Sequence, residues 1–219
     1  MSVDEVLIPE YTRKQENFNA LSHFLGIFVS LFVLGFDLVK LVKNEISLFH
    51  FFGLLVFAVS MFLVYGVSSL YHYLDKDNYH KKLFRVLDHC MIYLLIAGTY
   101  TPICFSLMSE HVVGLVMLII QWSGALIGII LNAFFFNNKV AGLISFILYV
   151  VMGWLVLFTG GFIYINIFSF AYILAGGIAY TIGAILYGIG HKKIGYHCIF
   201  HVFVLVSTIL QMVGVLAMF

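Results

Sequence analysis

Four ionisable residues at the edges of apolar runs could together bind a metal ion. His197 and His201 are four residues apart, so on a helix both imidazoles project from one face and can reach a single ion. His72 and Asp88 lie at the edges of two other apolar runs. A shared site therefore requires a fold that brings three separate segments to one place.

Composition places these segments in a lipid bilayer. The chain has 219 residues, of which 63% are hydrophobic and 10% are charged, and its mean hydropathy is +1.09. Soluble domains carry about 25% charged residues, so the composition excludes that class. The formal net charge is +1 and no basic run is interleaved with aromatic residues. We therefore expect no nucleic-acid partner, and the composition indicates no particular oligomeric state.

Seven apolar runs of about 20 residues predict an all-α integral membrane protein with a bundle of seven transmembrane helices. Strands are excluded because backbone polar groups in hydrocarbon must be satisfied within each segment. We expect a polar cytoplasmic segment over 1–19, with no cleaved signal, and one transmembrane domain over 20–219. The spans are expected at 20–39, 48–71, 87–108, 112–132, 140–158, 167–189 and 196–218.

The distribution of Lys and Arg predicts a cytoplasmic N-terminus and an external C-terminus. With seven spans, only Lys40 and Lys43 fall on the side opposite the N-terminus. The other nine share the side of the N-terminus, which the positive-inside rule assigns to the cytoplasm: Arg13, Lys14, Lys76, Lys81, Lys82, Arg85, Lys139, Lys192 and Lys193.

This orientation places the four candidate residues at one depth. His72 ends the second span, Asp88 begins the third, and the histidine pair occupies the first two turns of the seventh. At 1.5 Å per residue, all four lie within about 10 Å of the cytoplasmic boundary. Ionisable groups in spans usually face the bundle interior, so convergence on a metal ion is a reasonable hypothesis.

The alternative is that these are ordinary packed or snorkelling side chains, as single histidines at a membrane interface more often are. We apply that interpretation to the six others: His23, His50, His80, His89, His111 and His191. Cys198 adjoins His197, but one residue along a helix turns a side chain by about 100°. We interpret it, like the other two cysteines, as a packed thiol.

Several stretches resemble the hemolysin III family, bacterial relatives of the progestin and adiponectin receptors in a superfamily that includes alkaline ceramidases. The resemblance runs from about Asn19 to the C-terminus, in the same order. It is carried by NALSHFLG, SSLYHYL, LDHCMIYLLIAGTYTP, LYVVMGWLVLF, GGIAYTIGAILYG and HCIFHVFVLVST. The resemblance implies a multi-pass protein of the bacterial plasma membrane, with zinc near the cytoplasmic side of the bundle.

The same resemblance implies a role for each matching residue. Zinc would be held by His72, His197 and His201, with Ser68 and Asp88 nearby as catalytic groups. Three imidazoles leave the fourth position of zinc open, which is typical of catalytic sites, and a water bound there has a pKa near 7. Asp88 would act as general base. Ser68 would hydrogen-bond the water or a substrate carbonyl, or else bond back to its own helix.

Three functions remain open. The first is a zinc-dependent hydrolase of a lipid amide or ester with a role in membrane lipid or fluidity homeostasis, its lipid substrate or fatty acid lying in the helix bundle. The second is a membrane sensor or receptor with structural zinc. The third is a pore-forming cytolysin, which we rank last because a pore needs a polar stripe and the fourth to sixth spans are apolar nearly all round.

Overall fold

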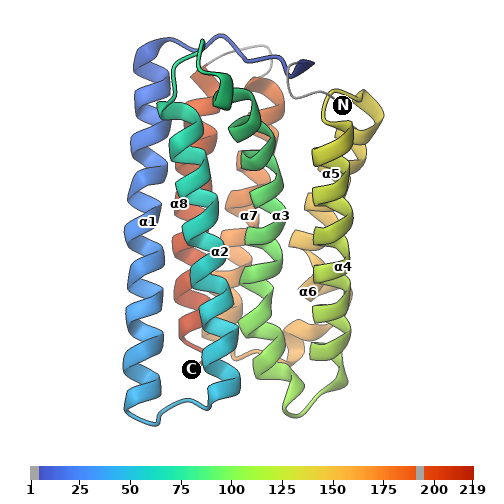
Figure 1. Ribbon diagram of the computed structural model, residues 1–219. Helices are drawn as coiled ribbons and strands as arrows, with labels where there is room; N and C mark the ends of the chain where they lie inside the picture. The colour runs from blue at the N-terminus through green and yellow to red at the C-terminus, as the bar shows by residue number, and fades with distance from the viewer. Residues whose placement is uncertain (1–4, 191–194) are drawn as a thin grey trace.

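The protein is all-helical in the computed structural model, in which residues 5–190 and 195–219 are described (Figure 1). No strand occurs within these residues. A short 3₁₀ helix, Gly161–Tyr164, follows the sixth helix. The α-helices are α1 (Arg13–Val42), α2 (Leu48–Tyr73), α3 (Tyr79–Met108), α4 (Val112–Phe135), α5 (Lys139–Gly153), α6 (Leu155–Phe158), α7 (Ile167–Gly190) and α8 (Gly195–Leu216).

The predicted fold class is confirmed. Six helices, α1 to α4, α7 and α8, are long and apolar enough to cross a membrane. The 15 residues of α5 extend only about 22 Å at 1.5 Å per residue. Together with α6, α5 forms the fifth crossing in chain order, which brings the total to seven. As an odd number of crossings requires, α1 begins and α8 ends at opposite ends of the bundle. We call the end where α1 begins, at the top of Figure 1, the upper end.

Two helices begin earlier than the apolar runs that predict them. Helix α1 begins at Arg13 rather than at 20, because Thr12 forms a capping box with Gln15. Helix α3 begins at Tyr79 rather than at 87, after the Asn78 cap. Asp88 therefore lies well inside α3 and does not begin it. Hydropathy marks only the part of a helix that lies in hydrocarbon, whereas the helix continues to its polar cap.

The fifth predicted span, 140–158, is not continuous. It breaks at Trp154, whose φ and ψ of −101° and 10° separate α5 from α6. Tyr100 of α3 compensates for the break, since its hydroxyl donates to the Gly153 carbonyl (2.7 Å) and accepts from the Val156 amide (3.2 Å). Backbone groups freed inside a membrane need such partners, and here a distant helix provides one.

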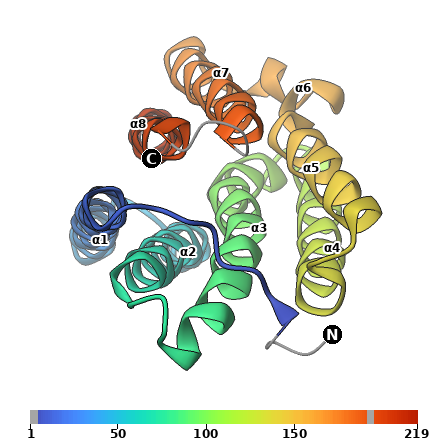
Figure 2. The same ribbon diagram turned by 90° about the horizontal axis from the view of Figure 1, so that it is seen from above.

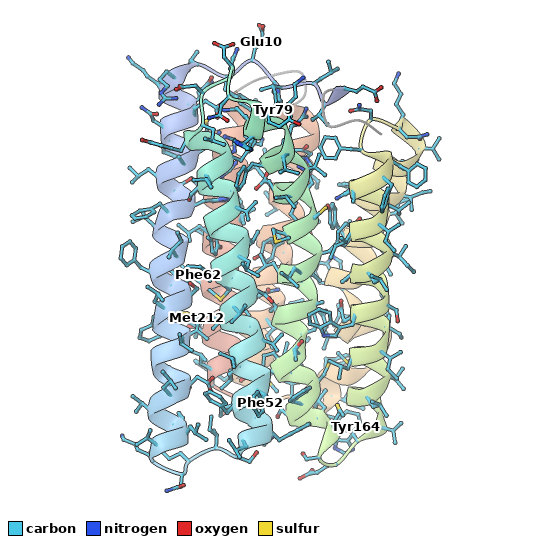
Figure 3. The ribbon with its side chains drawn as sticks, in the orientation of Figure 1. Glu10, Phe52, Phe62, Tyr79, Tyr164 and Met212 are labelled. Carbon is cyan, nitrogen blue, oxygen red and sulfur yellow. The ribbon has the colours of Figure 1, made fainter. Side chains whose placement is uncertain are left out.

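The helices surround α3, as seen from the upper end in Figure 2. Of the apolar window of α3, 67% is buried, against 22–44% for the other five long spans. Helix α8 packs beside α1 and α7, so the last helix returns to the first. Figure 3 shows Glu10 and Tyr79 at the upper end and Tyr164 at the opposite end. Between these ends, apolar side chains such as Phe52 and Phe62 are exposed on the outer wall.

We expect Gly128→Ala to destabilise the bundle. A Cβ at Gly128 of α4 would lie 2.1 Å from the ring of Tyr93 on α3, and overpacking of this kind costs about 1–3 kcal/mol. Gly66 is the matched control, because nothing lies within 4 Å of its Cβ position and alanine is favoured over glycine in a helix. Thermal unfolding in detergent should show a lower midpoint for Gly128→Ala only; equal midpoints would contradict the packing.

Membrane orientation remains a prediction. Asp77 and Glu110 are exposed on loops at opposite ends of the bundle. In a background with Cys90, Cys104 and Cys198 replaced, Glu110→Cys should react with an impermeant maleimide added to intact cells. Asp77→Cys should react only after permeabilisation. Labelling of Asp77→Cys in intact cells would invert the orientation. Lys192 and Lys193, which support it, lie outside the described residues together with His191.

Candidate metal centre

The three histidines predicted as metal ligands come together at the upper end of the bundle. His72 lies in the last turn of α2, while His197 and His201 lie in the first two turns of α8. Their exposed fractions are 0%, 8% and 1%. One ligand atom from each lies within 4.8 Å of the other two. This buried group could hold a metal ion.

The nitrogen atoms of this group fit an ion. Among the described residues, His72 Nε2 and His201 Nδ1 are buried without a hydrogen-bond partner. The Nε2 atoms of His197 and His201 are 3.0 Å apart, close to the roughly 3.3 Å that two nitrogens show at tetrahedral zinc with bonds of about 2.0–2.1 Å. Unpaired buried polar atoms are rare in native proteins, and a metal ion bound by the Nε2 atoms of the three rings would satisfy that of His72.

Two charged residues beside His72 were not identified from the sequence. Glu16 lies in the first turn of α1 with Oε2 2.6 Å from His72 Nδ1. Its other oxygen accepts a hydrogen bond from Lys81 Nζ of α3, at 2.7 Å. The sequence places Glu16 in the polar segment 1–19 and Lys81 in a cytoplasmic loop, yet their exposed fractions are 4% and 1%. Both residues are therefore buried within helices α1 and α3, which their sequence context did not indicate.

The residues of α1 carried a signal for this site. Glu16, Asn19 and His23 recur at i, i+3 and i+7, which places them on one face of a helix. His23 is packed, as interpreted, but its ring centroid lies 3.9 Å from that of His201. Among the described residues, neither His23 nor Asn19 has a side-chain hydrogen-bond partner. The face of α1 that packs beside the three histidines is therefore polar.

A cavity of about 520 Å³ is lined by two of the three histidines, His197 and His201. It is enclosed mainly by α3, α5, α7 and α8, and it reaches from the upper end to Gln211, ten residues beyond His201, or about 15 Å along α8. Most of its wall is apolar or aromatic, including Ile92, Ile96, Phe146, Val150, Phe200 and Val204. The space could accept an elongated apolar molecule with one end at the histidines.

The two predicted catalytic residues both line this cavity. Ser68 is buried, and its hydroxyl has no hydrogen-bond partner among the described residues. It therefore does not bond back to its own helix, which was the alternative. The side chain of Asp88 is 17% exposed and lies 3.9 Å from His89 Nδ1. The catalytic roles of Ser68 and Asp88 remain predictions.

The end of the cavity nearest the histidines is lined by residues that precede α1. Val6 is buried in a cluster with Val86 and Cys90 of α3. The ring of Tyr11 stacks on that of His197 at 4.8 Å, with an interplanar angle of 16°. Burial raises the pKa of the Tyr11 hydroxyl above its ordinary value, so it is neutral at physiological pH. The segment predicted to be merely polar instead packs across the upper end, as Figure 2 shows.

Comparison with known proteins identifies the family of the chain. The sequence model of the family described as "Haemolysin-III related" matches residues 11–212. The "Hemolysin-3 homolog" of Bacillus subtilis (strain 168) is 36% identical over 197 residues, which cover 89% of this chain and 90% of that protein. "Hemolysin-3" of Bacillus cereus is 37% identical over 194 residues, covering 88% and 86%. No solved structure was found to match. The chain therefore belongs to the haemolysin-III related family, whose members it resembles over nearly its whole length.

Proposed function

We propose that this multi-pass membrane protein is a zinc-dependent hydrolase that cleaves an amide or ester bond of a lipid. One observation carries the proposal: a largely apolar cavity is lined by His197 and His201, beside which the buried His72 has an unpaired Nε2. A structural zinc site is usually closed by four protein ligands, whereas a catalytic site has three and an open position. The described residues offer three.

The chemistry of the donor set favours zinc. Imidazole nitrogen suits zinc, copper, iron and nickel, and a set of three histidines is typical of catalytic zinc. His72, His197 and His201 would hold the ion. When bound, zinc would polarise a carbonyl group and lower the pKa of a water molecule to about 7.

Two residues of the cavity wall would carry out proton transfer and stabilise the carbonyl oxygen. Asp88 would accept a proton as water attacks the carbonyl carbon, and then return it to the departing amine or alcohol as the C–N or C–O bond breaks. The unpaired hydroxyl of Ser68 would donate a hydrogen bond to the carbonyl oxygen. The reaction thus consumes one water and releases a fatty acid.

The cavity argues for a lipid substrate. Its volume of about 520 Å³ is within the range of small-molecule sites, which is roughly 300–1,000 Å³. The apolar wall suits an acyl chain, and the charged residues that line the cavity, Arg85 and Asp88, lie in the upper part of α3. Because a lipid hydrolase changes membrane composition, we extend the proposal to a role in lipid or fluidity homeostasis. The membrane would be the bacterial plasma membrane, since these two relatives are from Bacillus species.

The names of the relatives offer a second candidate, since "Hemolysin-3" describes a protein that lyses blood cells. A pore needs a polar pathway, whereas the cavity that the described residues enclose has a largely apolar wall. The hydrolase is therefore the better supported candidate.

The two candidates differ in a direct assay. Purified protein in vesicles would be loaded with zinc and given a panel of N-acyl and O-acyl lipids, with release of fatty acid followed by mass spectrometry and leakage followed with an enclosed dye. We expect fatty-acid release that a chelator abolishes and added zinc restores. Bound zinc without release from any lipid would favour the sensor, and leakage without release would favour the pore.

A further inference from the structure

We propose that Glu16 and Lys81 form a buried ion pair that positions His72 to bind the metal ion. The inference rests on the proposed zinc site and assigns positioning residues to it. Both residues lie outside the ligand group, and neither is among the cavity-lining residues that carry the proposed chemistry. Glu16 contacts the ligand group at His72, and Lys81 contacts Glu16.

The contact with Glu16 determines which nitrogen of His72 can bind metal. Glu16 Oε2 lies 2.6 Å from His72 Nδ1, so a carboxylate there accepts a hydrogen bond from Nδ1–H. The other nitrogen, Nε2, is then unprotonated. It is also buried without a hydrogen-bond partner among the described residues. Metal-binding histidines commonly donate their second N–H to a carboxylate, which fixes the ring and raises its basicity.

Lys81 explains how the carboxylate remains charged in a buried position. A lone buried carboxylate is costly and tends to become neutral, and a protonated Glu16 would no longer be a purely accepting partner for His72. Lys81 Nζ donates to Glu16 Oε1 and to the Leu74 carbonyl, each at 2.7 Å. It also lies 5.2 Å from the ring centroid of Tyr71. The Lys81 ammonium group therefore has hydrogen-bond and aromatic partners in its buried position, as the Glu16 carboxylate has hydrogen-bond partners in its own.

This arrangement gives α1 an indirect part in the metal site. Helix α1 contributes none of the three candidate ligands, yet its Glu16 lies between a ligand from α2 and a lysine from α3. Loss of the carboxylate should weaken metal binding even though all three histidines remain.

The test is the metal affinity of a variant without either charge. Glu16→Gln alone would leave a buried, unpaired ammonium group and could prevent folding, so the variant is Glu16→Gln combined with Lys81→Met. The matched control is Glu10→Gln with Lys76→Met, which removes an exposed acid and an exposed lysine near the same end. Apo-proteins would be titrated with zinc and cobalt(II) against a chromophoric chelator, and their thermal unfolding would be recorded without metal.

We expect the Glu16–Lys81 double variant to bind both metals about 10- to 100-fold more weakly than wild type, the usual effect of removing such a carboxylate. Its apo-protein should unfold close to the wild-type temperature, and the control should bind within about twofold of wild type. Wild-type affinity in the double variant would overturn the positioning role and leave the zinc site intact. A wild-type protein that binds neither metal would overturn the proposed function and this inference with it.

A second measurement needs no variant. In zinc-loaded wild-type protein with ¹⁵N-labelled histidine, His72 should show a protonated Nδ1 and a metal-bound Nε2. Metal bound through Nδ1 would contradict the inference, because that nitrogen cannot bind metal while it donates to Glu16.

Discussion

Asp88→Asn should lower the turnover of a lipid substrate by about 10²–10⁴-fold, the usual contribution of a general base, while zinc content stays near that of wild type. An asparagine keeps the size of the side chain but cannot accept the proton. Asp88 lies on the cavity wall and outside the group of three histidines, so the metal should remain. Turnover and zinc would be measured on the same preparations.

The control for this variant is Asp77→Asn, on the exposed loop between α2 and α3, which should leave both quantities unchanged. Two results would contradict the assigned role. Full loss of zinc from Asp88→Asn would make the aspartate a ligand, and unchanged turnover would remove it from the mechanism.

His201→Ala should reduce bound zinc from about one equivalent per chain to below roughly a tenth, and turnover should fall to background, because two histidines cannot complete a stable zinc site. His201 is 1% exposed and lies within the ligand group. His80→Ala is the control, since His80 is exposed near the same end and should keep its zinc. Elemental analysis after chelator-free purification gives the answer; a His201→Ala protein that retains full zinc would show that the ion is bound elsewhere.

The class of fold and the histidine group could be predicted because they follow from local patterns. A span is a run of about 20 apolar residues whatever surrounds it, and the spacing of His197 and His201 places both on one helix face. His72 followed from counting spans, since seven crossings bring the end of the second and the start of the seventh to one side. Asp88 followed from its place at the start of the third apolar run, the resemblance to the family added Ser68, and both line the cavity.

The features that were not predicted depend on contacts between distant segments. Glu16 is buried because His72 and Lys81, which are 56 and 65 residues away, satisfy its two oxygens. A charge in a polar stretch is usually solvated, and the spacing of Glu16 with Asn19 and His23 indicates a shared helix face but not what that face packs against. The break at Trp154 similarly depends on the hydroxyl of Tyr100, 53 residues from the carbonyl it contacts.

The central claim is that the three buried histidines hold a zinc ion, and X-ray absorption at the zinc edge tests it most directly. Protein purified without chelator should contain one zinc per chain with three imidazole nitrogens at about 2.0–2.1 Å and one further light ligand. Absence of zinc would contradict the claim. So would a sulfur ligand at about 2.3 Å, which would assign Cys198 to the site in place of a histidine.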